Sequence, residues 1–325
     1  MNDRYYRKVY SEAAEDRIRG LVDLVGPQVN STDFLQEPSV LRDVNVILSG
    51  WGAPEMNEGF LAHCPNLKAV FYGAGSIRGV VTESFWERQI RITSALKQNA
   101  IPVAEYCLSQ VLFALKRGHY FLRETRENKA APEDRKIHGA YKSTVGIVSL
   151  GNISKHLCRL LKPMDIKIIA YDPFPDRVFG KEYGIEWVDL NTVFSRSDVV
   201  SIHAPLLDQT LKLITGQHLL SMKENAAVVF TSAVAPERSV LEERTVCQAL
   251  KKREDIEAIL DVSYSSSAAV SFLDLPNVHW TPGIAGSMDR ECERMGNFMV
   301  DELERFIRGE ALQGELSQFK VTHLA

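Results

Sequence analysis

The sequence predicts an α/β protein built on two doubly wound parallel β-sheets, with helices on both faces of each sheet. Short runs rich in Val and Ile alternate with helix-length segments along the chain, which is the pattern of parallel strands joined by helical crossovers. These runs fall into two groups, separated by the long apolar segment 103–115. We therefore expect a small sheet followed by a larger one.

The first group of runs predicts a small parallel sheet with its own helices. A charged helix is expected at residues 12–24. Strands are expected at 44–48, 67–72 and 90–93, with helices near 56–63 and 84–88. The apolar segment 103–115 predicts a buried helix, with Pro102 at its start, where proline is tolerated. The polar segment 118–142 predicts a surface helix or loop.

The second group predicts about six strands, enough for a complete doubly wound sheet. The expected strands are 145–150, 166–171, 198–203, 226–231, 256–262 and 278–281, and further helices are expected at 217–223, 244–252 and 288–308. The last helix is highly charged, but it carries Met295, Met299, Leu303 and Phe306 on one side. That apolar side predicts that the helix packs onto another element.

Residues 143–172 predict a strand, a turn, an amphipathic helix and a second strand that ends in an acid, the usual layout of a dinucleotide-binding βαβ unit. The three positions of the G-x-G-x-x-G motif are Ser149, Gly151 and Ser154, so only the central glycine is present. Asp172 follows Gly151 by about twenty residues, where a carboxylate can bind the adenosine ribose and favours NAD over NADP. From these residues alone, a plain βαβ unit without a nucleotide is the alternative.

Composition excludes several classes of protein. The 325 residues suggest two domains or one large one. The net charge of −4 and the pI near 6.1 predict no nucleic-acid partner and no anionic membrane partner. Apolar runs of membrane-spanning length are absent, and the first residues do not form a signal peptide. Five scattered cysteines predict reduced thiols in a cytoplasmic protein, and the eight histidines show no metal-binding spacing.

Several segments together resemble the D-isomer-specific 2-hydroxyacid dehydrogenase family of the phosphoglycerate dehydrogenase type. These are 99–105 (NAIPVAE), 144–172, 200–206 (VSIHAPL), 259–262 (ILDV) and 275–286 (LPNVHWTPGIAG). The resemblance implies a Rossmann-like NAD domain at 102–287, inserted into a flavodoxin-like substrate domain made of 1–101 and 288–325. It also implies a homodimer with the helices after Asn99 at the interface, and a small 2-oxo or 2-hydroxy acid as ligand.

The resemblance further implies NAD(H) as cofactor and assigns residues to it. The implied cofactor-binding residues are Ser149, Gly151, Asn152, Ile153, Asp172, His203, Ala204, Pro205, Thr231 and Asp261. The implied substrate-binding residues are Gly73, Ala74, Gly75, Ser76 and Arg78. Structural alternatives stay open for several of them. Asp261 could cap a strand end, His203 could be a hydrogen-bonded structural histidine, and Gly73 and Gly75 could be turn residues.

The catalytic residues that the resemblance implies are replaced in this chain. The family reduces 2-oxo acids with an arginine, a glutamate and a histidine. The histidine position is Gly283, the glutamate position is Ser266, and the arginine position is Ala233, or Glu237 if it is counted from the following helix. Arg238 stands one position from Glu237, and Tyr264 is the best substitute proton donor.

Three functional hypotheses follow. The first is an NAD(H)-binding oxidoreductase by descent that is weak or inactive on ordinary 2-hydroxy and 2-oxo acids. The second is a reductase with a substitute proton donor such as Tyr264. The third is a pseudoenzyme that senses NADH or forms a heteromer with an active relative.

Overall fold

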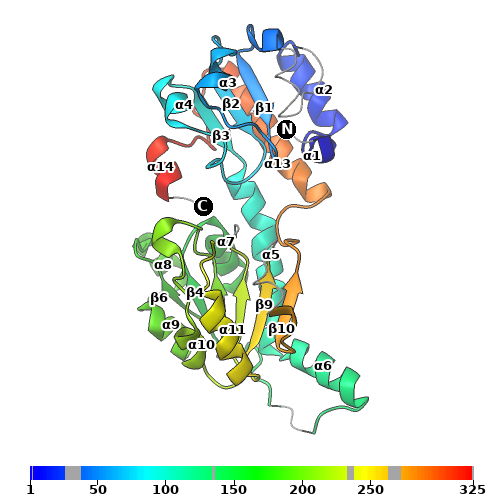
Figure 1. The fold of residues 1–325 in the computed structure, drawn as a ribbon, viewed down its shortest axis with the longest axis vertical. Coiled ribbons are helices and arrows are strands. Elements are labelled where there is room, and N and C mark those ends of the chain that lie inside the picture. The colour runs from blue at the N-terminus through cyan, green and yellow to red at the C-terminus, as the bar shows by residue number, and fades with distance from the viewer. Residues whose placement is uncertain (2, 26–37, 134–135, 233–237, 263–271, 324–325) are drawn as a thin grey trace. The chain divides into compact units, whose positions relative to one another are not determined.

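The computed structural model describes residues 1, 3–25, 38–133, 136–232, 238–262 and 272–323. They form two compact units (Figure 1). Unit 1 combines Met1–Ala100 with Ser287–Ala325, and unit 2 is Ile101–Gly286. The strand pairings of both named sheets are parallel, which confirms the predicted class of fold.

Unit 1 contains a 3-stranded sheet in the order β1-β2-β3. Its strands are β1 (Val46–Ser49), β2 (Ala69–Tyr72) and β3 (Arg91–Ser94). Its helices are α1 (Asp3–Val9), α2 (Glu12–Leu21), α3 (Glu58–Ala62), α4 (Glu83–Glu87), α13 (Arg290–Ile307) and α14 (Gln318–His323), with a 3-10 turn at Pro38–Leu41.

Both faces of β2 are buried, each in a different apolar cluster. Val70 and Tyr72 pack with residues of α3 and α4, whereas Ala69 and Phe71 pack with residues of α1, α2 and α13. The α13 residues in this second cluster include Met295, Met299 and Leu303. The predicted docking of this charged helix through its apolar side is therefore confirmed.

Unit 2 contains a 7-stranded sheet in the order β10-β9-β8-β7-β4-β5-β6. Its strands are β4 (Thr144–Val148), β5 (Lys167–Tyr171), β6 (Glu186–Trp187), β7 (Val199–Ile202), β8 (Ala227–Phe230), β9 (Glu257–Asp261) and β10 (Val278–Thr281). Its helices are α6 (Gly118–Asn128), α7 (Asn152–Leu161), α8 (Arg177–Tyr183), α9 (Leu190–Arg196), α10 (Gly216–Leu220) and α11 (Glu243–Lys252), with a 3-10 turn at Asp208–Thr210. Helix α5 (Leu96–Leu115) runs from unit 1 into unit 2.

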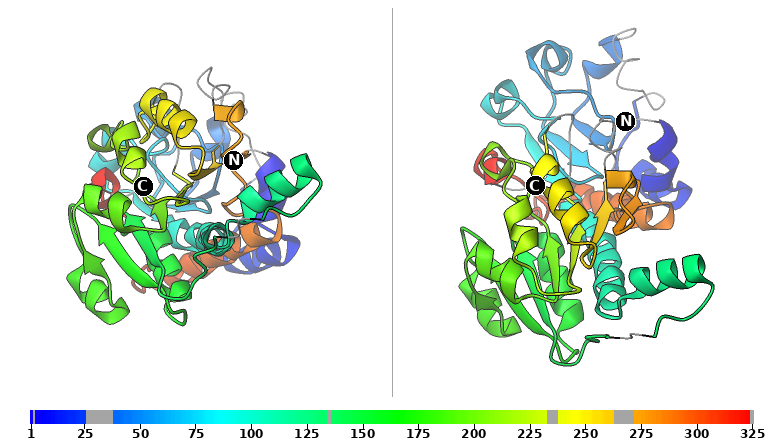
Figure 2. Two further views of the ribbon diagram at one scale, coloured as in Figure 1. Left: turned by 90° about the horizontal axis from the view of Figure 1, so that it is seen from below. Right: turned by 60° about the horizontal axis from the view of Figure 1, so that its bottom comes forward.

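Helices cover both faces of this larger sheet (Figure 2). Along β8, Val228 and Phe230 pack with α9, α10 and α11 on one face. Ala227 and Val229 pack with α5, α7 and α8 on the other. Because both faces are buried, the strands consist of continuous apolar runs instead of alternating patterns, and this is why the sequence revealed most of them.

Two expectations about elements were wrong in detail. The larger sheet has seven strands, not about six, because β6 is only 2 residues long and gives no recognisable run. Pro102 lies inside α5, which begins at Leu96, and not at the start of a helix at residue 103. Since proline has no N–H, the carbonyl of Gln98 loses its usual helical donor there, and the helix nevertheless continues because its apolar residues are buried against the sheet.

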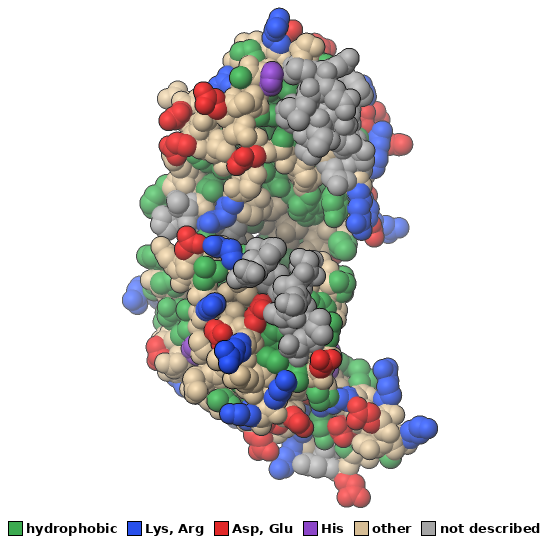
Figure 3. All heavy atoms as spheres, viewed as in Figure 1, with side chains coloured by type: hydrophobic (Ala, Val, Ile, Leu, Met, Phe, Trp, Pro, Cys, Tyr) green, Lys and Arg blue, Asp and Glu red, His purple; other side chains and the backbone are tan. Residues whose placement is uncertain are grey.

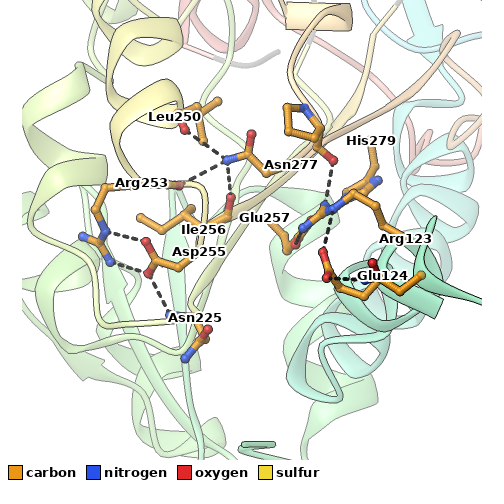
Figure 4. A network of polar contacts seen from close by, with 12 residues as sticks. Arg123, Glu124, Asn225, Leu250, Arg253, Asp255, Ile256, Glu257, Asn277 and His279 are labelled. Carbon is orange, nitrogen blue, oxygen red and sulfur yellow. Dashed lines mark hydrogen bonds and ion pairs between the residues drawn. The ribbon is translucent and has the colours of Figure 1, made fainter. Parts of the chain in front are cut away.

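Helix α6 extends away from the sheet of unit 2 (Figure 1) and has no buried residue. Polar contacts fasten it to the edge of the sheet (Figure 4). Arg123 contacts the Glu257 carboxylate at 3.3 Å and donates to the Pro276 carbonyl at 2.7 Å. His279 Nε2 is hydrogen-bonded to the same carboxylate, and its ring stacks on His119 with 4.1 Å between centroids.

Charged side chains of both signs are interspersed over the face shown in Figure 3, outside the grey atoms. This agrees with the small net charge of −4. Within the described ranges, every helix is too short or too polar to span a membrane.

Candidate cofactor site

The turn between β4 and α7 holds the dinucleotide motif. Ser149 adopts a φ of 72°, and its N–H donates to the Tyr171 carbonyl at 2.8 Å. Gly151 is the N-cap residue of α7, and a Cβ placed on it would meet no heavy atom within 4 Å. The backbone before α7 therefore faces open space, so a phosphate can approach the unpaired N–H groups of the first helical turn. This geometry fits a dinucleotide.

Ser154 occupies the third motif position on the first turn of α7. Its side chain is completely buried, and its Oγ donates to the Ser149 carbonyl at 2.5 Å. The third glycine of the motif normally permits close packing of helix and strand. Serine is small enough to keep that packing here, and its hydroxyl finds an acceptor in the turn.

Asp172 follows β5, and two backbone donors fix its carboxylate. Oδ2 accepts from the Leu150 N–H at 2.7 Å, and Oδ1 accepts from the Phe174 N–H at 2.8 Å. Each carboxylate oxygen has a second lone pair. The carboxylate thus retains acceptor capacity for ribose hydroxyls while it ties the motif turn to the end of β5.

The motif turn lies where the order of strands reverses. β4 pairs with β5 on one side and with β7 on the other. His203 follows β7, and its N–H donates to the Val148 carbonyl at 2.9 Å, which holds the carboxyl ends of β4 and β7 together. Ligands of open parallel sheets bind outside the carboxyl ends of strands at such a reversal.

His203 is buried, and hydroxyl groups lie beside both of its ring nitrogens. Nε2 is 2.8 Å from Ser201 Oγ, and Nδ1 is 3.4 Å from Thr231 Oγ1. Burial lowers the pKa of His203 to about 4, so the ring is neutral at pH 7. These contacts favour the structural alternative for His203. Its neighbour Ala204 is also buried, whereas Pro205 is half-buried.

The buried carboxylate of Asp261, at the end of β9, organises the turn after β10. Oδ1 accepts from Thr281 Oγ1 at 2.6 Å and from the Ile284 N–H at 2.8 Å. Oδ2 accepts from the Ala285 N–H at 2.8 Å. Thr281 Oγ1 also lies 2.9 Å from the Tyr106 hydroxyl. The carboxylate therefore acts as a structural clamp on residues 281–285, a larger role than the simple strand-end cap that was the structural alternative.

Gly283 lies within this clamped turn, at the position where the resemblance implies a histidine. Its φ is 73°, and its N–H donates to the Thr281 carbonyl at 3.0 Å. Glycine adopts this left-handed conformation without a steric penalty, whereas most other residues are strained there. The turn is thus shaped for glycine.

Among the other candidate catalytic residues named above, the structure describes Arg238 alone. Ala233, Ser266 and Tyr264 lie outside the described residues. Arg238 forms an ion pair with Asp208 at 2.6 Å, and its side chain is 47% exposed. In the structure Arg238 is thus a solvent-exposed surface cation.

The predicted substrate loop of unit 1 uses part of its backbone internally. The Gly73 N–H donates to the Ser49 carbonyl and the Ala74 N–H to the Tyr72 carbonyl, each at 2.8 Å. Within the described part of the chain, the N–H groups of Gly75 and Ser76 have no hydrogen-bond acceptor. Arg78 follows on the surface of this loop. Of the four predicted backbone donors, Gly75 and Ser76 are therefore the ones left for a ligand.

Comparison with known proteins identifies the family. Residues 108–285 match the model of the D-isomer specific 2-hydroxyacid dehydrogenase NAD binding domain. The chain belongs to this family. The match covers the motif turn, Asp172 and Asp261, and it confirms both the predicted resemblance and NAD(H) as the cofactor.

Curated relatives carry several activities. D-lactate dehydrogenase of Escherichia coli (strain K12) is 28% identical over 325 residues, which is 98% of this chain and 95% of that protein. Glyoxylate reductase of Korarchaeum cryptofilum is 28% identical over a segment that is 83% of this chain and 82% of that protein. D-3-phosphoglycerate dehydrogenase of Methanocaldococcus jannaschii is 25% identical over 91% of this chain, but the chain spans only 56% of that longer protein.

Solved structures share the fold. The NAD-complexed D-isomer specific 2-hydroxyacid dehydrogenase of Lactobacillus delbrueckii ssp. bulgaricus has a TM-score of 0.79 and 17% identity, with 98% of each chain covered. The apo-structure of D-lactate dehydrogenase from Escherichia coli has a TM-score of 0.71 and 21% identity, with coverage of 97% and 98%. These likenesses confirm the two Rossmann-like domains.

Sequence reasoning missed three residues that shape the site. The motif alone counts Ser154 as an absent glycine, although its hydroxyl supports the turn. Tyr106 and Thr281 complete the Asp261 clamp. Thr281 and Pro282 match the family directly before the replaced histidine position, and this match was a usable signal for Thr281. Nothing in the sequence links Tyr106 to Asp261. In the described ranges, no group of three or more His, Cys, Asp or Glu residues could hold a metal ion.

Proposed function

We propose that this member of the family binds NAD(H) but is weak or inactive on ordinary 2-hydroxy and 2-oxo acids, because its standard acid–base residues are replaced. The observation that carries the proposal is Gly283, at the histidine position, with its φ of 73°. Bound NAD(H) supplies or accepts a hydride. Reduction of a 2-oxo acid also needs a proton donor, and a glycine cannot provide one.

The proposed cofactor contacts are those of the turn and the adjacent strand ends. The N–H groups of Gly151, Asn152 and Ile153 bind the pyrophosphate at the start of α7. Asp172 accepts from the ribose hydroxyls and disfavours NADP, because its carboxylate repels a 2′-phosphate. Asp261 stays a candidate for the nicotinamide carboxamide, but it must share its oxygens with three internal donors.

For an acidic ligand, we propose that the backbone of the unit 1 loop binds a carboxylate. Gly75 and Ser76 supply the donors, and Arg78 adds positive charge nearby on the same loop. The ligand class is a small 2-oxo or 2-hydroxy acid. This site would still bind the acid after turnover is lost. Such binding is consistent with a pseudoenzyme that reports the NADH state or forms a heteromer with an active relative.

We also propose a homodimer formed through the helices after Asn99. In support, α6 has no buried residue. Phe113, Leu122, Ile137 and Tyr141 are large apolar side chains that this region exposes, with Leu122 at 61% and Tyr141 at 67%. Light scattering should give twice the mass of the chain, and Leu122→Glu should shift it to the monomer. A monomeric wild type would contradict this part of the proposal.

The buried free thiols Cys64, Cys107, Cys158 and Cys292 support a reducing compartment, and we propose the cytoplasm. Burial raises the pKa of Cys107 and of Cys158 to about 12, so these thiols are unreactive. All four side chains are packed in the interior, and Cys107 Sγ lies 3.8 Å from Thr231 Oγ1.

The test is an NADH and NADPH titration of the full chain beside NADH consumption with a panel of 2-oxo acids. We expect NADH binding, weaker NADPH binding, and no turnover above background. Gly283→His, Ser266→Glu and Ala233→Arg together should raise turnover. Turnover by the native chain would contradict the loss of activity and direct attention to Tyr264 as a substitute proton donor. Failure to bind NADH would refute the cofactor role.

A further inference from the structure

The peptide group that joins Ser149 to Leu150 is held from both sides. Its carbonyl accepts from Ser154 Oγ at 2.5 Å. Its N–H donates to Asp172 Oδ2 at 2.7 Å. A peptide group is planar, so these two hydrogen bonds fix the orientation of the whole group. The Gly151 N–H belongs to the next peptide group, which is joined to this one through Leu150, so fixing the first group also fixes where the second one begins.

These two hydrogen bonds compensate for the strained backbone of Ser149. Ser149 has a φ of 72°, where non-glycine residues are uncommon. A glycine in the first motif position would adopt this conformation freely, whereas serine needs surrounding contacts to keep it there. The Ser154 hydroxyl supplies one such contact from inside the protein, because its side chain is completely buried.

The Ser154 bond is not the usual local bond of a helical serine. Serine in a helix commonly bonds the carbonyl four residues earlier. Ser197, another completely buried serine of unit 2, is the C-cap residue of α9 and donates to the Val193 carbonyl four residues earlier at 2.6 Å. Ser154 instead reaches five residues back, past the helix N-cap and into the turn. Its acceptor therefore belongs to the motif turn and not to the helix.

We infer that Ser154 is a positioning residue for dinucleotide binding, and that it works together with Asp172 to lock the 149–150 peptide group in the conformation that the missing glycine would otherwise provide. The two departures from G-x-G-x-x-G are thus coupled: Ser154 is needed because residue 149 is serine. This inference rests on the proposed NAD(H) binding. It adds a residue whose role is to shape the phosphate-binding turn.

The experiment is a double-mutant cycle in the full chain with Ser154→Ala, Ser149→Gly and both changes together. NADH dissociation constants and melting temperatures are measured for all four proteins. Loss of one hydrogen bond predicts that Ser154→Ala weakens NADH binding about fivefold when residue 149 is serine. It should also lower the melting temperature by about 2–4 °C. With glycine at position 149, the same change should alter the dissociation constant less than about twofold, because the turn no longer needs support.

Ser197→Ala is the matched control. It removes an equally buried serine hydroxyl from the same unit, so it should lower the melting temperature by a similar amount and leave NADH binding unchanged. An equal effect of Ser154→Ala in both backgrounds, or no effect on binding in either, would overturn the inference. If the wild type does not bind NADH, the proposed function fails and so does the role in binding. Non-additive melting temperatures would then still support the coupling of the two serines, and additive ones would refute it.

Discussion

Replacing Asp261 with asparagine removes one negative charge and one acceptor from the clamp on residues 281–285. The remaining oxygen can still accept from Thr281 and Ile284, which both bond Oδ1. The new amide NH₂ then points at the Ala285 N–H, which now bonds Oδ2 at 2.8 Å. Two donors face each other in a buried place, since Asp261 is only 6% exposed.

The magnitude follows from these three bonds. A hydrogen bond to a charged group contributes about 1.5–3 kcal/mol, and a buried donor left unsatisfied costs about 1–3 kcal/mol. For the Ala285 N–H, the lost hydrogen bond and the unsatisfied donor are one effect and are not added together. The hydrogen bonds from Thr281 and Ile284 remain, but they become weaker without the negative charge. We therefore expect Asp261→Asn to lower the free energy of unfolding of unit 2 by about 2–4 kcal/mol.

Urea unfolding gives the global loss, and hydrogen exchange measured by mass spectrometry gives its location. The peptide that contains Ile284 and Ala285 should exchange faster in the variant than in the wild type. Asp208→Asn is the control, because the Asp208 side chain is 86% exposed and its charged partner among the described residues is a surface arginine. Equal unfolding midpoints and equal exchange of that peptide in wild type and Asp261→Asn would refute the clamp.

Three further predictions follow from the same unit. Gly283→Ala should lower the melting temperature by about 2–4 °C, since a φ of 73° costs alanine about 1 kcal/mol. His203 should contribute up to about 3 kcal/mol to the fall in the free energy of unfolding between pH 6.5 and pH 4. Burial lowers its pKa to about 4, so the unfolded chain takes up a proton that the native chain does not. His203→Gln should remove this contribution from unfolding curves measured across that range and leave the contribution of His119, whose pKa burial also lowers to about 4. Arg123→Met should destabilise the chain by about 3 kcal/mol in urea, because it removes a cationic partner of Glu257, which is only 5% exposed.

Each of these predictions has a control in the same chain. Gly283→Asn should lose less stability than Gly283→Ala, because asparagine tolerates positive φ better; the reverse order would contradict the conformational argument. His63 is exposed, so His63→Gln should leave the pH dependence unchanged. Arg126 is exposed on the same helix as Arg123, and an equal loss from Arg126→Met would show that the Glu257 contact is not what stabilises the helix.

The sequence predicted elements whose signal is local. The strands of the larger sheet are buried on both faces, so runs such as Val199–Ile202 stand out from their polar surroundings. The βαβ unit was recognised for the same reason, since α7 has a strongly apolar side. The two-residue β6 was missed because it forms as an edge strand beside β5 and has no run of its own.

The site was less predictable, because its contacts join residues that are far apart in the chain. Asp261 is a candidate site residue in the sequence, and Ala285 lies in a segment that resembles the family. Nothing in the sequence shows that the Asp261 carboxylate accepts a hydrogen bond from the Ala285 N–H. Ser154 was seen only as a missing glycine, because the value of a hydroxyl depends on where the Ser149 carbonyl points. The left-handed φ of Gly283 is likewise a property of the folded turn.

The insertion of unit 2 between the two parts of unit 1 has a consequence for how the protein folds during synthesis. Unit 2 is continuous in sequence, so its residues can fold as soon as they leave the ribosome. Unit 1 cannot be completed then, because α13 covers Phe71 and Ala95 and because Arg91 pairs with Glu315. The first hundred residues must therefore keep an apolar surface exposed while nearly two hundred more are made. That interval is when a chaperone would be needed most, and a chain that stops after unit 2 would leave this surface uncovered permanently.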